Sequence, residues 1–148
     1  MKIKRFRGKL ADGEQQKILL SGGDSDKGYR INKLLLMTVQ PGGNNQEAVV
    51  KVYKTKQTSV PTASATINFK EDTLMGAAVF SASANQKTDP EDFAVIFDKE
   101  VVNQDIYITH TDNENAVEIN YYMELEQVKM SGPEQANVNF SAAILHGE

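Results

Sequence analysis

The sequence predicts an all-β protein, a jelly-roll-like sandwich of two sheets with about eight or nine strands. Three observations predict this fold. Residues 116–126 alternate between apolar and polar side chains, turn-forming clusters divide the chain at short intervals, and the segments between them are rich in Val, Ile, Tyr, Phe and Thr. No alternation of strands with helices occurs, so a parallel α/β fold is not expected.

The stretch 116–126 carries the clearest strand signal. The apolar residues on one parity are Val117, Ile119, Tyr121, Met123 and Leu125, and the polar residues on the other are Glu118, Asn120, Tyr122, Glu124 and Glu126. Successive side chains of a strand point to opposite faces. The pattern therefore predicts one face in a core and one acidic face turned outward.

The same reasoning predicts strands near residues 2–10, 16–21, 29–39, 47–55, 65–70, 74–83, 92–98, 104–111 and 116–129. In the third of these, one apolar face is expected from the shared parity of Tyr29, Ile31, Leu35, Met37 and Val39, which Lys33 interrupts.

Two segments leave alternatives open. Residues 72–84 could begin a short helix capped by Asp72 or Thr73, but Gly76 in the middle favours a strand. Residues 134–148 could form a last strand, a short helix or an arm that reaches onto a neighbour.

The length of 148 residues suits one domain, 1–148, in which residues 1–10 and 132–148 could serve as N-terminal and C-terminal arms. The chain has no cysteine, which excludes disulfides, Cys-based zinc sites and a thiol nucleophile. No apolar run approaches the ~20 residues of a membrane span, and none follows the basic start as in a signal peptide. A soluble protein made in the cytosol, without a membrane partner, is expected.

Charge is divided unevenly along the chain. Residues 1–88 carry 14 Lys and Arg against 7 Asp and Glu, a net of +7, whereas residues 89–148 carry 2 against 13, a net of −11. Such a basic start could bind nucleic acid. It could instead pair with the acidic half, either in its own fold or on a neighbouring subunit. The second interpretation is favoured because Ile3, Phe6 and Leu10 interleave with the cations as sheet anchors would.

Catalytic residues are not assigned. A hydrolytic triad would need His110 or His146 as its base, and no Gly-x-Ser-x-Gly elbow marks a nucleophile. His110 is expected to be a partly buried structural residue. Glu118, Glu124 and Glu126 have a spacing compatible with glycosidase carboxylates, but any acidic strand has that spacing. A solvated or subunit-facing surface is the favoured interpretation.

No metal or cofactor is expected either. Asp24–Gly28 begins like a calcium loop, but Gly28 and Leu35 occupy two positions that need oxygen ligands. The glycine pairs at 22–23 and 42–43 lack the residues of a phosphate-binding loop. Tyr107 and Tyr122 could form a glycan platform, although an interface is favoured and Tyr121 belongs to the apolar parity.

Several blocks of the sequence resemble small, mostly uncharacterised virion-associated proteins of marine bacteriophages. These blocks are Lys4–Leu10, Gln46–Gln57, Val95–Glu100, Asn103–His110 and Asn120–Glu126. The resemblance spans nearly the whole chain and includes no catalytic motif. It implies a non-enzymatic structural protein of a phage particle, made in the host cytoplasm and located in the virion.

The expected role is a capsid decoration or cement protein, or a vertex (minor capsid) subunit, that binds copies of itself and the major capsid protein or another virion protein. A homo-oligomer such as a trimer or pentamer is expected. The expected interface residues are Lys4, Arg5, Arg7, Glu118, Tyr122, Glu124 and Glu126. The alternative is a tail, spike or collar component that binds a neighbouring virion protein, or a host glycan through Tyr107 or Tyr122. A carboxylate-based glycosidase is a third hypothesis.

Overall fold

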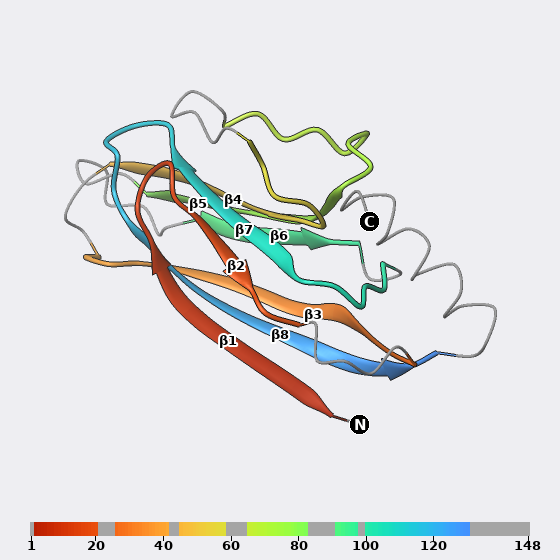
Figure 1. Cartoon of the computed structure of the whole chain (residues 1–148). Coiled ribbons are helices and arrows are strands. Elements are labelled where there is room, and N and C mark those ends of the chain that lie inside the picture. The colour runs from red at the N-terminus through yellow and green to blue at the C-terminus, as the bar shows by residue number, and fades with distance from the viewer. Residues whose placement is uncertain are drawn as a thin grey trace.

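The computed structural model describes residues 2–20, 26–41, 45–58, 65–82, 91–97 and 100–130. Within these ranges the chain forms no helix and eight strands, β1 (Ile3–Leu10), β2 (Gln15–Ile18), β3 (Lys27–Thr38), β4 (Gln46–Tyr53), β5 (Leu74–Ala82), β6 (Glu91–Ile96), β7 (Ile106–Asp112) and β8 (Ile119–Lys129). They form two antiparallel sheets that lie against each other (Figure 1). The prediction of an all-β, two-sheet sandwich is confirmed.

The strand order is that of a jelly roll with one departure. One sheet has the order β1-β8-β3 and the other β2-β7-β4-β5-β6. In a closed jelly roll β6 would cross to pair with β3. Here it stays hydrogen-bonded to β5 and lies beside β3, and the described residues form no ladder between the two strands. The outer edge of β3 is bonded at Tyr29, which forms an isolated bridge with Val102. The sandwich is therefore open along the line where β3 and β6 meet.

β8 is the central strand of the three-stranded sheet and follows the predicted alternation. Ile119, Tyr121, Met123 and Leu125 are buried, whereas the side chains between them are partly exposed. Ladders to β1 on one side and β3 on the other hold the strand in place. The strand begins at Ile119 rather than 116 because Ala116 has a φ of 56°, which breaks the extended conformation.

β3 contains a β-bulge. Its pairing with β8 passes from Ile31 directly to Lys33, so Asn32 is an extra residue without a partner. A slip of one residue turns every following side chain to the opposite face of the sheet.

The bulge overturns one prediction about β3. Leu34 and Leu36 enter the core, at 3% and 8% exposure, whereas Leu35, Met37 and Val39 are 49%, 67% and 38% exposed. The prediction that these last three share the buried face of the strand is wrong. Parity counted along the sequence does not include the extra residue.

The predicted strand at 65–70 is also wrong. The Lys70 N–H donates to the Asn68 side-chain oxygen at 3.0 Å, and the Glu71 N–H donates to the Asn68 carbonyl at 3.1 Å. These bonds close tight turns, as Asn side chains commonly do. At 72–84, by contrast, the favoured strand is confirmed as β5.

The core lies between the two sheets and draws on strands from both. Its fully buried large side chains are Leu10, Ile31, Gln46, Val50, Val52, Met75, Ile106, Ile108, His110, Ile119, Met123 and Leu125. Of the two expected arms, residues 1–10 contribute the edge strand β1, and 132–148 lie outside the described residues.

Candidate functional site

The outer face of the three-stranded sheet carries most of the residues expected to make contacts. We call it the charged face and define it by Arg5, Arg7 and Lys9 of β1, Tyr122, Glu124 and Glu126 of β8, and Arg30 and Lys33 of β3. The strand registers place Arg5, Glu124 and Lys33 in one row across the sheet. Cations on both outer strands therefore flank the acids of the central strand, an arrangement that stabilises cross-strand pairing.

Glu124 is the centre of this face. The Tyr122 hydroxyl donates to its Oε1 at 2.5 Å, and Nε of Arg5 lies 3.4 Å from the same oxygen. The hydrogen bond from Tyr122, with smaller contributions from Lys33 and Arg5, holds the Glu124 pKa below its ordinary value. The same hydrogen bond raises the pKa of Tyr122.

The other acids of this region are also paired within the chain. Arg30 donates to Oε2 of Glu126 from both Nε and Nη2, each at 2.9 Å. Lys9 reaches Glu118 at 3.5 Å just beyond the strand. The first strand and the acidic strand thus meet inside one fold. Docking of the basic segment on a neighbouring copy stays a prediction, and it would have to compete with these contacts.

Two of the expected interface cations have different surroundings. Lys4 lies off the charged face, with its ammonium 4.9 Å from the centre of the Tyr29 ring in a cation–π contact. Arg7 lies opposite Tyr122 in the strand register, is exposed, and forms no ion pair with the described residues. Among the predicted contact cations, Arg7 is therefore exposed without a partner acid in the described ranges.

The charged face does not have the electrostatics of a glycosidase site. A general acid of that class needs a carboxyl group with a raised pKa. The pKa of Glu124 is instead lowered, and Glu126 is held by Arg30. Both acids form ion pairs within the sheet, Glu124 with Arg5 and Glu126 with Arg30.

The remaining candidates from the sequence are not brought into a site. Across the described ranges, no three His, Asp or Glu side chains gather closely enough to hold a metal ion. Residues 22–25, the glycine pair at 42–43 and His146 lie outside the described ranges. Tyr107 is buried, so the prediction that it could contact a glycan is wrong, whereas Tyr122 is partly exposed.

Sequence reasoning missed an apolar strip beside the charged face. Large exposed hydrophobic side chains number seven in the described ranges, and five of them lie on β3, directly after it or on β6: Leu35, Met37, Val39, Phe93 and Val95. We call these five residues the apolar strip. The uninterrupted run Leu34-Leu35-Leu36-Met37 could have predicted this strip. On a strand, such a run places apolar side chains on both faces of the sheet, so one set enters the core and the other needs a second partner to cover it.

A groove of about 310 Å³ runs along the opening between β3 and β6. Leu35 and Phe93 of the apolar strip line it, together with Leu36, Ala78 and Ile96, and Lys33 stands at its side. A closed jelly roll would have a backbone ladder at this position. The opening of the sandwich therefore produces a surface hollow lined by apolar side chains together with the polar Asn32 and Lys33.

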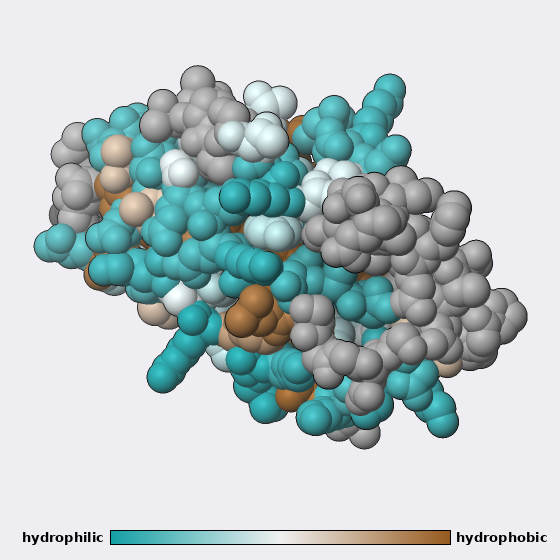
Figure 2. Space-filling model, viewed as in Figure 1, coloured by the Kyte–Doolittle hydropathy of each residue, from teal (hydrophilic) through white to brown (hydrophobic). Residues whose placement is uncertain are grey.

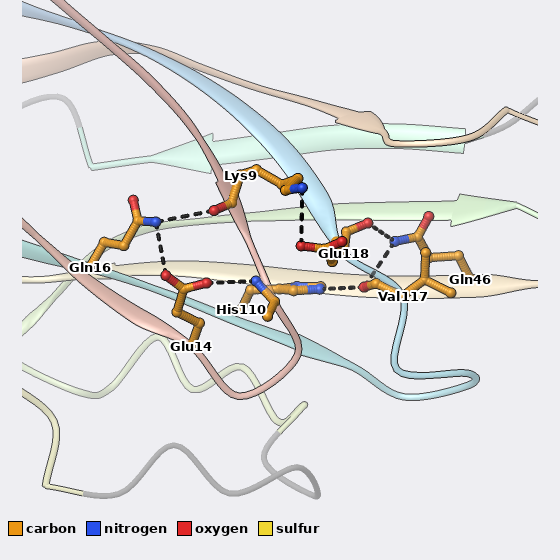
Figure 3. A network of polar contacts seen from close by, with 8 residues as sticks. Lys9, Glu14, Gln16, Gln46, His110, Val117 and Glu118 are labelled. Atoms are coloured by element: carbon orange, nitrogen blue, oxygen red, sulfur yellow. Dashed lines mark hydrogen bonds and ion pairs between the residues drawn. The ribbon is translucent and has the colours of Figure 1, made fainter.

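A polar network occupies one end of the sandwich (Figure 3). His110 on β7 is fully buried and its Nε2 lies 2.9 Å from the Val117 carbonyl. A carbonyl only accepts hydrogen bonds, so Nε2 carries the proton. The Gln46 amide donates to the carbonyls of Val117 and Glu118. These contacts fix the chain just before β8.

The loop that leads into β8 is held from its other side by Asp112. This buried carboxylate accepts backbone hydrogen bonds from Glu47, Glu114 and Val117, at 3.0, 3.0 and 2.7 Å. A polar hollow of about 290 Å³ lies beside the loop, lined by residues including Gln46 and Ala116. The hydrogen bonds of Gln46, His110 and Asp112 therefore fix the geometry of this loop.

Comparison with known proteins does not extend this description. No protein-family model matches the chain, and no curated protein shows significant sequence similarity to it. No helix within the described ranges is long and apolar enough to span a membrane.

Proposed function

We propose that this protein is a non-enzymatic structural subunit of a bacteriophage particle, which acts by binding copies of itself and the shell. The protein would serve as a capsid decoration, cement or vertex subunit. Its partners would be the major capsid protein or another virion protein. The resemblance of five sequence blocks to virion-associated proteins supports the phage setting. The jelly-roll strand order supports it too, because this architecture recurs in viral capsid domains.

The observation that carries the proposal is the apolar strip. Single exposed hydrophobic side chains are ordinary, but five of the seven in the described ranges lie on or directly after two neighbouring edge strands, and Leu35 and Phe93 line the groove between these strands. Such surfaces mark protein–protein contacts, since their exposure to water is unfavourable until a partner covers them. The charged face, with Arg7 accessible, provides an adjoining polar surface for the shell protein.

Quantitative mass spectrometry of purified virions tests this function. Hundreds of copies per particle are expected of a decoration or shell protein, and about sixty of a vertex protein under icosahedral symmetry. A dozen or fewer copies would indicate a tail or collar protein instead. Its complete absence from purified particles, despite expression during infection, would refute a structural role.

A tail, spike or collar component that binds a glycan is the second candidate. The observation that favours it is the partly exposed Tyr122 beside the exposed Arg7, because aromatic rings with polar neighbours suit sugar binding. A glycan array in calcium-containing buffer tests this candidate. Binding that Tyr122→Ala abolishes would support it, and an array without any binding would argue against it.

A further inference from the structure

We infer that the apolar strip binds the apolar strip of a second copy across a two-fold axis, with Met37 of each copy seated in the β3–β6 groove of the other. The inference rests on the proposed function in one respect, since it names the partner for self-association. Four features of the molecule support the surface, the partner and the geometry of this contact.

The first feature is the distribution of protection along β3. Edge strands avoid unwanted pairing through charged side chains and bulges. The first half of β3 has both, with Lys27, Arg30 and Lys33 and the bulge at Asn32. From Leu34 to Val39 the strand has neither. Association is therefore directed to the second half, where the exposed side chains are apolar.

The second feature is the contrast between the two lateral edges of the sandwich. At the β1 edge the outward side chains are Arg5, Arg7 and Lys9, all exposed cations. The surface that includes β1 and β2 is mostly hydrophilic in Figure 2. The β3–β6 edge instead exposes the apolar strip. The β1 edge is therefore suited to contact with water, and the β3–β6 edge is suited to contact with a partner.

The third feature is that a projection and a hollow lie side by side. Met37 is 67% exposed and follows Leu35 on the outer face of β3, while Leu35 itself lines the groove. A two-fold contact requires a surface that is complementary to itself, so that residue i meets residue j in both directions. Met37 and the adjacent groove meet this requirement, and Met is the apolar side chain that adapts best to an irregular hollow.

The fourth feature is the area. The five side chains are 38–67% exposed. They present roughly 500 Å² per copy, and two facing strips would bury about 1,000 Å², near the lower end for a specific interface. The five residues of the strip carry no charge, and the one charged residue that lines the groove, Lys33, is exposed. A partner that binds through charges would leave this surface exposed.

Analytical ultracentrifugation over a range of concentrations is the direct test. We expect the wild-type protein to form dimers. Met37→Asp should raise the dimer dissociation constant at least thirtyfold, as loss of a central hot spot does. Leu19→Asp is the matched control, because Leu19 is equally exposed, at 68%, but lies just after β2 away from the strip. It should leave the dissociation constant unchanged.

Cross-linking tests the geometry. The chain has no cysteine, so single introduced thiols give no background. A mixture of Met37→Cys and Ala94→Cys copies should form a disulfide under mild oxidation, since Ala94 lines the groove. A mixture of Leu19→Cys and Ala94→Cys copies should not.

A wild-type protein that stays monomeric, or dimers that persist in Met37→Asp, would overturn the inference. A trimer or pentamer would also overturn the two-fold contact. None of these results would determine the copy number in virions, so the proposed function would still be tested separately. Conversely, a cross-linked dimer that is absent from virions would support the contact and refute the phage role.

Discussion

The hydroxyl of Tyr122 donates a 2.5 Å hydrogen bond to Oε1 of Glu124, two residues further along the same face of β8. Arg5 approaches the same oxygen from β1, so one carboxylate joins a tyrosine of its own strand to a cation of the next. This arrangement sets the orientation of the central acid before any partner arrives. It also leads to a measurable titration behaviour.

Replacing Tyr122 with Phe should raise the pKa of Glu124 towards its ordinary value of 4.5, because the largest contribution that lowers it is lost. The side-chain carbon shift of Glu124, followed by NMR as pH falls, measures the midpoint. Tyr107→Phe is the control, since Tyr107 lies in the other sheet. An unchanged midpoint in Tyr122→Phe would show that the cations, not the hydroxyl, control this carboxylate.

The sign of the pH effect on stability follows from the same shift. The Glu124 pKa is lower in the folded protein than in the unfolded chain, so deprotonation of this group favours the folded state. Its contribution is present above about pH 4.5 and is lost as pH falls through the folded-state pKa. We expect the acid-dependent loss of stability to be smaller in Tyr122→Phe, as urea unfolding at a series of pH values would show. An equal or steeper loss would contradict the assignment.

Leu34 and Leu35 are adjacent in sequence and should differ sharply in their contribution to stability. Leu34→Ala should lower the free energy of unfolding by about 2–5 kcal/mol, because Leu34 is 3% exposed and its truncation leaves a cavity. Leu35→Ala should change it by less than about 1 kcal/mol. Both are measured by urea unfolding in a Met37→Asp background, so that self-association does not contribute. Equal losses would mean that the bulge at Asn32 does not set the faces of β3.

That pair of leucines also shows where sequence reasoning ends. β8 could be predicted because apolar and polar side chains alternate along it without interruption, and this pattern can be read from the strand alone. The faces of β3 could not be predicted, because the extra residue at Asn32 exists only in the register against β8. One residue of slip moved three large apolar side chains from the expected core to the surface, and with them the surface on which the self-association contact rests.

The sequence predicted that basic and acidic residues would meet on the charged face, but it did not predict which residues would pair. The polarity of the sequence indicated that the basic start would meet the acidic strand near 116–126. Only the β1–β8 register shows that Arg5 meets Glu124 within one chain. Sequence order carries no information about which of two identical chains supplies the cation, so the choice between an internal and an intermolecular pair needed the fold.

Asp112→Ala should loosen the loop that leads into β8. Three backbone N–H groups, from Glu47, Glu114 and Val117, lose their common acceptor. We expect a loss of about 2–4 kcal/mol in the free energy of unfolding, and faster hydrogen exchange at these three amides. Asp112→Asn keeps one carbonyl oxygen and should lose less. Unchanged exchange at the Val117 amide in Asp112→Ala would show that the loop is held by other contacts.

Removal of the buried imidazole tests the network from the opposite side. His110→Ala should lower the free energy of unfolding by about 2–4 kcal/mol, since it creates a cavity and leaves the Val117 carbonyl with only the longer hydrogen bond from Gln46, at 3.4 Å. His110→Gln should lose less, because an amide N–H can donate to the same carbonyl. Nδ1 of His110 has no hydrogen-bond partner in the part of the chain that the structure describes, so replacing the ring with the Gln side chain breaks no second hydrogen bond. If Gln and Ala cost the same in urea unfolding, packing of the ring rather than its hydrogen bond would be what stabilises this end of the sandwich.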